Sequence, residues 1–228
     1  RAVLVPVLLG PALAHDDPVQ LVLEGDTVLG VGNVTSISNL VVNDAGVWIV
    51  EADTDHANTD ADSVLLQTGL TIAREGSAVG APAGATIDGF DPLNLNEASQ
   101  TAWNLFLDGT SGINDDSAVY LNSALLFQEG DLLTAAGISP GSDWRGFFDV
   151  KLNNSDQLLV MASIDDPAIP TTTDRMLAVI DVTGGALGTI TVIAKEGDVL
   201  AGQVGALTDM GTNPCLLYTS PSPRDRSL

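Results

Sequence analysis

The sequence predicts an all-β protein built from tandem four-stranded antiparallel units. We expect a β-propeller-like arrangement that is incomplete, with three full units and the start of a fourth. Three observations lead to this prediction. Short landmarks recur in the same order along the chain, apolar runs of four to six residues alternate with Gly, Asn and Asp, and no window keeps an amphipathic helical period.

Three landmarks define the repeat. The first is an acidic turn, Glu-Gly-Asp or Glu-Gly-Ser, and it begins at Glu24, Glu75, Glu129 and Glu196. The second is an Asn that follows an apolar alternation, at Asn43, Asn96 and Asn153. The third is an acidic residue before another apolar run, at Asp62, Asp116 and Asp174. We therefore divide a β-repeat domain, residues 15–214, into units at about 24–74, 75–128 and 129–194 and a partial unit at 195–214.

Each unit reads as two pairs of short strands. The Asn43-Asp44-Ala45-Gly46 run supplies residues that tolerate a positive φ, so a tight hairpin is expected there, and Ser155-Asp156 takes the same role in the third unit. Four strands in about 50 residues is the size of a propeller blade, and such a sheet buries both faces only by stacking on a neighbour. A string of small β-sandwiches or a β-solenoid is the alternative, although a sandwich usually needs about 100 residues.

The first 14 residues are expected to be the remnant of a secretory signal peptide. An apolar run follows Arg1, Ala12 and Ala14 fit a cleavage site, and the sequence then switches abruptly to the polar His15. The alternative is a buried strand. The run is too short to cross a bilayer, which takes about 20 apolar residues.

Residues 215–228 differ in composition from the rest of the chain. They hold the single Cys and a Ser-Pro-Ser-Pro run, and residues 215–225 match the translation of a transposase-type sequencing adapter. We expect this segment to be an adapter-derived artefact and the native chain to continue beyond Pro214.

The charge balance excludes some partners. With 30 acidic and 8 basic residues in 228, the net charge is −22, which disfavours binding to nucleic acid or to anionic membranes. Apolar residues make up 45% of the chain, enough to fill a core without disulfides. No membrane insertion is expected.

Around the Glu-Gly-Asp turns and the landmark Asn residues, the chain resembles bacterial exported tandem-repeat proteins that have an N-x-x-G-x-x-A-F signature and a variable C-terminal anchor. The resemblance covers residues 24 to about 200. Asn43 and Gly46 keep the signature, whereas Ser99 and Asp156 stand where the family has Gly in the later units. The resemblance implies export and surface display through a C-terminal segment, and it implies no enzymatic activity.

A calcium site is the main alternative to a purely structural role for the acidic residues. Asp55, Asp108 and Asp165 each lie twelve residues after a landmark Asn, and residues 53–62 are dense in oxygen ligands. The segment lacks the Gly and Glu of an EF-hand. We expect solvated loops, with no metal and no cofactor, and keep Ca²⁺ as the alternative.

No other pattern indicates catalysis. The Glu-Gly-Asp runs could supply paired carboxylates, but they recur in every unit and are expected to be turns. His15 and His56 fit neither a triad nor a zinc site. Trp48 and Trp103 are expected in the core, and Trp144 is the candidate for an exposed aromatic platform.

The sequence therefore predicts an exported, surface-associated structural or binding module that is not an enzyme, with no catalytic, cofactor-binding or metal residues assigned. Its partner would be an unknown extracellular ligand or cell-envelope component. The alternative is a carbohydrate-active propeller-type enzyme that uses Asp and Glu carboxylates.

Overall fold

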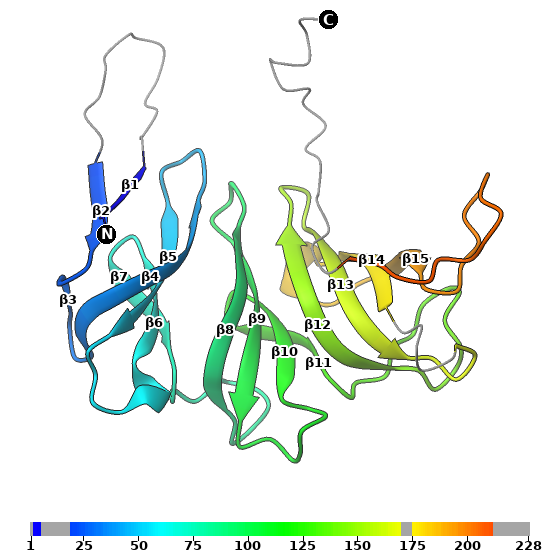
Figure 1. Ribbon diagram of the computed structural model, residues 1–228, viewed down its shortest axis with the longest axis horizontal. Coiled ribbons are helices and arrows are strands. Elements are labelled where there is room, and N and C mark those ends of the chain that lie inside the picture. Colours follow the sequence, from blue (N-terminus) through cyan, green and yellow to red (C-terminus); the bar gives the residue numbers. More distant parts are fainter. Residues whose placement is uncertain (1, 6–18, 170–174, 212–228) are drawn as a thin grey trace, which may run out of the picture.

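The computed structural model of the chain describes residues 2–5, 19–169 and 175–211, which form strands, turns and two short 3₁₀ turns and contain no α-helix (Figure 1). The all-β prediction is confirmed. The strands are β1 Ala2–Val5, β2 Val19–Leu23, β3 Thr27–Val28, β4 Gly32–Val42, β5 Trp48–Thr54, β6 Ser63–Gln67, β7 Leu70–Arg74, β8 Thr86–Leu95, β9 Thr101–Asp108, β10 Ser117–Leu121, β11 Ala124–Gln128, β12 Asp143–Leu152, β13 Gln157–Asp165, β14 Arg175–Asp181 and β15 Ile190–Lys195. The 3₁₀ turns are η1 Thr59–Ala61 and η2 Thr183–Gly185.

Three antiparallel sheets make up most of the molecule. Each is a meander in which every strand pairs with the next one along the chain: β3 to β7, β8 to β11, and β12 to β15. The predicted units at 24–74, 75–128 and 129–194 each contain one sheet, apart from the last residue of β15. The sheets stand in a row, and the described residues do not close into a ring (Figure 1). The long strands β4, β8 and β12 contact one another in turn along this row.

The three sheets share their irregularities as well as their strand order. Apart from the two-residue strand β3, each sheet has four strands, which we count in chain order as β4 to β7, β8 to β11 and β12 to β15. The pairing of the first two of these four strands is interrupted twice in each sheet, between β4 and β5, β8 and β9, and β12 and β13. The pairing of the last two strands is interrupted once in each sheet, after the second pair of residues. Because a bulge bends a strand and increases its local twist, recurrent bulges give the sheets a common shape.

The predicted hairpin turns are confirmed, and they explain the residues that replace Gly in the signature. The position is occupied by Gly46, Ser99 and Asp156, whose φ angles are 77°, 61° and 53°. All three lie in the left-handed region, which is costly for a residue with a Cβ atom. The later units thus keep the turn geometry without the Gly that favours it.

A network of hydrogen bonds from the second landmark joins the sheets. The side-chain amide of Asn43 donates to the carbonyl oxygen of Asn96 at 3.0 Å, and that of Asn96 donates to the carbonyl oxygen of Asn153 at 3.3 Å. Beside them, the Asp44 N–H donates to the Glu97 carboxylate at 3.0 Å, and the Glu97 N–H to the Asn154 side-chain oxygen at 2.9 Å. We call these contacts the asparagine ladder.

The apolar core lies between the sheets. One cluster joins the first sheet to the second, a larger one joins the second to the third, and a third covers the outer face of the first sheet. Trp48 and Trp103 are buried, as predicted. The prediction of an exposed platform at Trp144 is wrong: the residue is 1% exposed and stacks on Phe127 with ring centroids 4.9 Å apart. Its neighbours Pro140 and Gly141 suggested a loop, but Trp144 is the second residue of the long strand β12 and is covered by the second sheet.

Candidate functional site

The Glu-Gly-Asp runs form the turns that lead from one sheet to the next, which confirms the predicted turns. The glycines have positive φ angles of 93°, 72°, 83° and 89° at positions 25, 76, 130 and 197. Three turns are closed by an Asp carboxylate, of Asp26, Asp131 or Asp198, which accepts a hydrogen bond from the backbone N–H three residues earlier. The N–H groups of the first three glycines donate to the carbonyl oxygens of Val34, Ile87 and Trp144, near the starts of β4, β8 and β12, and the fourth donates to that of Leu207, beyond β15.

The Glu of each turn folds back onto the first residue of the third strand of its own sheet. Its backbone N–H donates to the carbonyl oxygen of Ser63, Ser117 or Arg175. At Glu75 and Glu196 the carboxylate also accepts the N–H of that same residue, at 3.1 and 3.3 Å. The third landmark, Asp62 in the first unit and Asp116 in the second, immediately precedes this strand. The fold therefore brings the first landmark, the Glu of the turn, next to the third.

This geometry places two carboxyl groups side by side in each of the first two units. Glu75 lies beside Asp62, and burial together with the Asp62 charge raises the pKa of Glu75. Glu129 hydrogen-bonds to Asp116, and burial, followed by this bond and the Asp116 charge, raises the pKa of Glu129 to about 7. In both units the Glu pKa rises in part because two adjacent carboxylates resist ionising together, and the Glu129 carboxyl group is therefore partly protonated near neutral pH.

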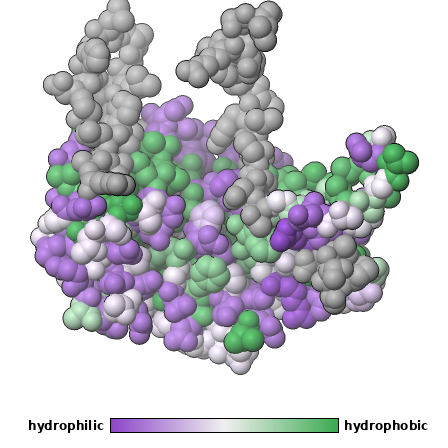
Figure 2. All heavy atoms as spheres, viewed as in Figure 1, coloured by the Kyte–Doolittle hydropathy of each residue, from purple (hydrophilic) through white to green (hydrophobic). Residues whose placement is uncertain are grey.

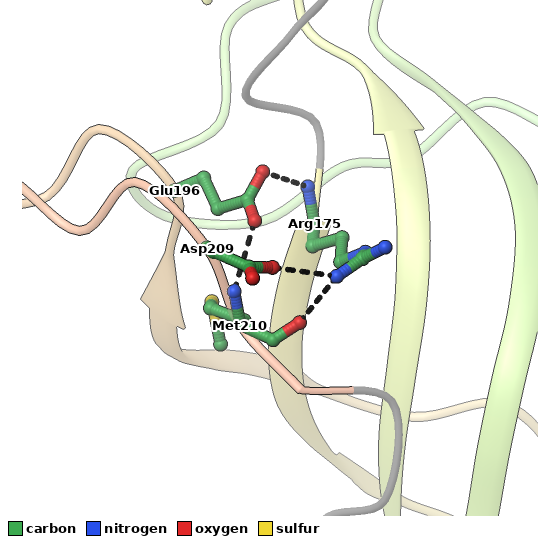
Figure 3. Close-up of polar contacts among 4 residues, drawn as sticks. All are labelled: Arg175, Glu196, Asp209 and Met210. Atoms are coloured by element: carbon green, nitrogen blue, oxygen red, sulfur yellow. Dashed lines mark hydrogen bonds and ion pairs between the residues drawn. The ribbon is translucent and has the colours of Figure 1, made fainter.

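In the third unit the carboxylate of the turn Glu, Glu196, has different hydrogen-bond partners (Figure 3). The two carboxylate oxygens of Glu196 accept from the backbone N–H groups of Arg175 and Met210, at 3.3 and 3.0 Å. The Arg175 guanidinium reaches the Asp209 carboxylate at 2.8 Å and the Met210 carbonyl oxygen at 2.6 Å. Asp174, the landmark residue in this unit, lies outside the described residues.

An open hollow of about 480 Å³ lies between the second and third sheets. We call it the inter-sheet hollow, and the residues that characterise it are Asp91, Phe106, Asp116, Glu129, Arg145 and Phe148. Glu129 also borders a second, polar hollow of about 730 Å³, lined by residues 82–83, 109–112, 114–115 and 128–131. Glu129 is therefore accessible to a ligand in either hollow, whereas Asp116 lines the inter-sheet hollow.

The inter-sheet hollow offers more hydrogen-bond acceptors than free cations. Arg145 is held by Asp143 and Asp165, at 3.1 and 2.8 Å. Burial raises the pKa of Asp91, whose carboxylate accepts a hydrogen bond from the Asn104 amide at 3.5 Å. Apolar and hydrophilic residues are interspersed over the face of the molecule drawn in Figure 2. Phe106, which is 41% exposed, gives the hollow an accessible apolar side chain. Carboxyl groups beside an open ring suit a ligand with hydroxyl groups and an apolar face.

The same geometry does not suit glycoside hydrolysis by this pair. A hydrolase holds its two carboxyl groups about 5 to 9.5 Å apart, with the glycosidic bond between them. The Asp116 carboxyl group instead lies close enough to Glu129 to raise the pKa of Glu129 directly.

The residues considered for calcium do not converge. Asp55 accepts from the Asn33 backbone and side chain at 2.6 and 2.9 Å, Asp108 accepts from the Gly109 N–H, and Asp165 is paired with Arg145. Within residues 2–5, 19–169 and 175–211 no three His, Cys, Asp or Glu side chains are grouped so that they could hold a metal ion.

Of the two histidines, the structure describes His56, whose Nδ1 atom contacts the Asn58 backbone; His15 lies outside the described residues.

The carboxyl pairs could have been found from the sequence. Asp62 and Glu75 are separated by thirteen residues, as are Asp116 and Glu129. A constant separation between two landmarks indicates a constant contact. The roles of Asp91, Phe106 and Arg145 left no such signal, because they depend on how two sheets meet.

Comparison with known proteins gives a family and no activity. A model of a family described as "Family of unknown function (DUF7453)" matches residues 12–214. No curated protein and no solved structure gives a significant match. In the part of the chain that the structure describes, no helix has both the length and the apolar character needed to cross a membrane. Since the match spans most of the chain, the protein belongs to the DUF7453 family.

Proposed function

We propose that the protein is an exported, surface-associated repeat module that binds a ligand without catalysis, and that its units are propeller-like blades. The observation that carries this proposal is the repetition of polar contacts: the asparagine ladder links all three sheets, and the carboxyl pairs recur in the first two units. Catalysis would favour a single constellation, whereas repeated contacts favour a scaffold with binding surfaces between its units.

The inter-sheet hollow is the proposed binding site, and a hydroxyl-rich ligand such as a cell-envelope polysaccharide is the proposed partner. Phe106 supplies the apolar face, and the carboxyl oxygens of Asp91, Asp116 and Glu129 supply hydrogen-bond acceptors. The acidic chain repels anionic polymers, which favours a neutral or cationic saccharide. Export and surface display are supported by the acidity and by the resemblance to exported repeat proteins.

A second candidate function is a carbohydrate-active enzyme. It is favoured by Glu129, whose pKa of about 7 keeps a proton available near neutral pH, as a general acid requires. The direct contact between Glu129 and Asp116 argues against it, because no space remains between the two groups for the bond to be cleaved.

Retention and product release on a panel of neutral and cationic polysaccharides separate the two functions. The binding proposal expects retention without released sugars, and Phe106→Ala to abolish retention. Leu70→Ala is the matched control, because it removes a side chain that is 73% exposed on the first sheet, away from the hollow. Released product would overturn the non-catalytic proposal. Equal retention of the two variants would remove the hollow as the binding site.

A further inference from the structure

The short N-terminal hairpin has the same register as the outer hairpin of every sheet. In each case the residue just before the Glu of the turn pairs with the first paired residue of the preceding strand. The pairs are Leu23 with Ala2, Arg74 with Val64, Gln128 with Ala118, and Lys195 with Met176.

The hairpins also share one interruption. After two pairs, the last strand skips one residue and pairing then resumes. The skipped residues are Leu21 in β2, Ile72 in β7, Leu126 in β11 and Ile193 in β15, all of them apolar. A bulge changes which face the following side chains occupy, so four hairpins with one bulge at one position have a common design.

The segment that follows is also the same. After β2, the Asp26 carboxylate accepts from the Leu23 N–H and the Gly25 N–H bonds to Val34, as at the later turns. Val22 is buried in the cluster on the outer face of the first sheet. This cluster stands where the core of a preceding unit would stand.

We propose that β1 and β2 are the third and fourth strands of another copy of the unit, and that the open edge of β1 is a docking edge for the first two strands of such a copy. This proposal replaces the leader interpretation of residues 2–5 and does not depend on how the protein is exported. Within the described residues β1 pairs only with β2.

The partner is specified by the complete units. In each of them the third strand pairs with the second in one register, through the segments Ile49 to Ala52, Ala102 to Leu105 and Leu159 to Ala162. The partner of β1 is therefore a two-stranded hairpin like β12–β13, which binds by adding strands to the sheet.

Cysteine pairs test the register. In a Cys215→Ser background, Val3→Cys with Val22→Cys places the two cysteines opposite each other, and we expect a disulfide to form on mild oxidation. Val5→Cys with Val22→Cys is the control: Val5 pairs with Val19, so these cysteines are about 10 Å apart and should remain reduced. Equal cross-linking of the two pairs, or an exported chain whose mass shows cleavage after Ala14, would overturn the proposal.

A fusion tests the docking edge. Residues 143–174, which contain β12 and β13 with their natural connection, are placed directly before Arg1 of the full chain. The added hairpin should complete the sheet, raise the Tm by about 4 °C and slow hydrogen exchange of the β1 amides about tenfold. The control is the same fusion with Val160→Pro in the added copy, which removes a ladder hydrogen bond from a central strand. Equal melting and exchange in the two fusions would overturn the docking edge.

Discussion

The asparagine ladder predicts that one amide contributes to the packing of two sheets. Asn96 is 3% exposed; its Oδ1 accepts from the Gln100 N–H at 2.9 Å, and its Nδ2 donates to the Gln100 side-chain oxygen at 2.6 Å and to the Asn153 carbonyl oxygen at 3.3 Å. Asn96→Asp keeps the acceptor and the shape, loses the donor and places a charge near both of these oxygens. Two lost hydrogen bonds cost about 1 kcal/mol each and the poorly solvated charge about 2 kcal/mol, so we expect a loss of about 4 kcal/mol at pH 7.

Asn153→Asp is the matched control. The Asn153 Oδ1 accepts from Ser155 and Gln157, and its Nδ2 donates only within its own turn, to the Gln157 side chain. We expect this change to cost about 1 kcal/mol or less, because nothing is lost between sheets.

Urea unfolding at pH 7 and at pH 3.5 measures both variants. The difference of about 3 kcal/mol between the two losses should narrow at the lower pH, because a protonated Asp regains a donor. Equal losses at the two positions would show that the amides act only within their turns and would refute the ladder as a link between sheets.

Four further predictions follow from burial, charge and backbone geometry. The folded-state pKa of Glu129 is about 7 and the unfolded value is near 4.5, so the free energy of unfolding should fall as pH rises between these values. After allowance for solvent screening, Glu129→Gln should remove about 1 kcal/mol of this fall. Urea unfolding from pH 4 to 8 measures it. Gly46→Ala, at a φ of 77°, should cost about 1 kcal/mol in the same assay, whereas Gly80→Ala, with open space around it and no positive φ, should cost nothing. Trp144→Ala should cost about 3 to 5 kcal/mol, while Phe106→Ala leaves stability almost unchanged; similar losses would contradict the burial. Isothermal titration with Ca²⁺ should give no heat and no shift in Tm, since the acidic residues do not converge in the described part of the chain.

The repeat made most of the fold predictable. The landmarks marked turns, and the turn chemistry of Asn43 to Gly46 identified the first hairpin before its partner strands were known. Trp144 was placed wrongly because neighbouring Pro and Gly indicate a local turn, whereas burial is decided by the sheet that packs above. The inter-sheet hollow could not be predicted for the same reason. Phe106, Asp91 and Arg145 come together only when two sheets pack, and no single stretch of sequence indicates how they pack.

The two side-chain amides of the asparagine ladder, those of Asn43 and Asn96, donate across the sheets to main-chain carbonyl groups, and every residue type carries one. A sheet can therefore be recognised by its neighbour whatever side chain occupies the receiving position, as long as the hairpin keeps its backbone path. Duplication, loss or exchange of whole segments by recombination then leaves the junctions intact. Variation in length between relatives should arise in steps of one sheet, with the sequences of individual sheets free to diverge.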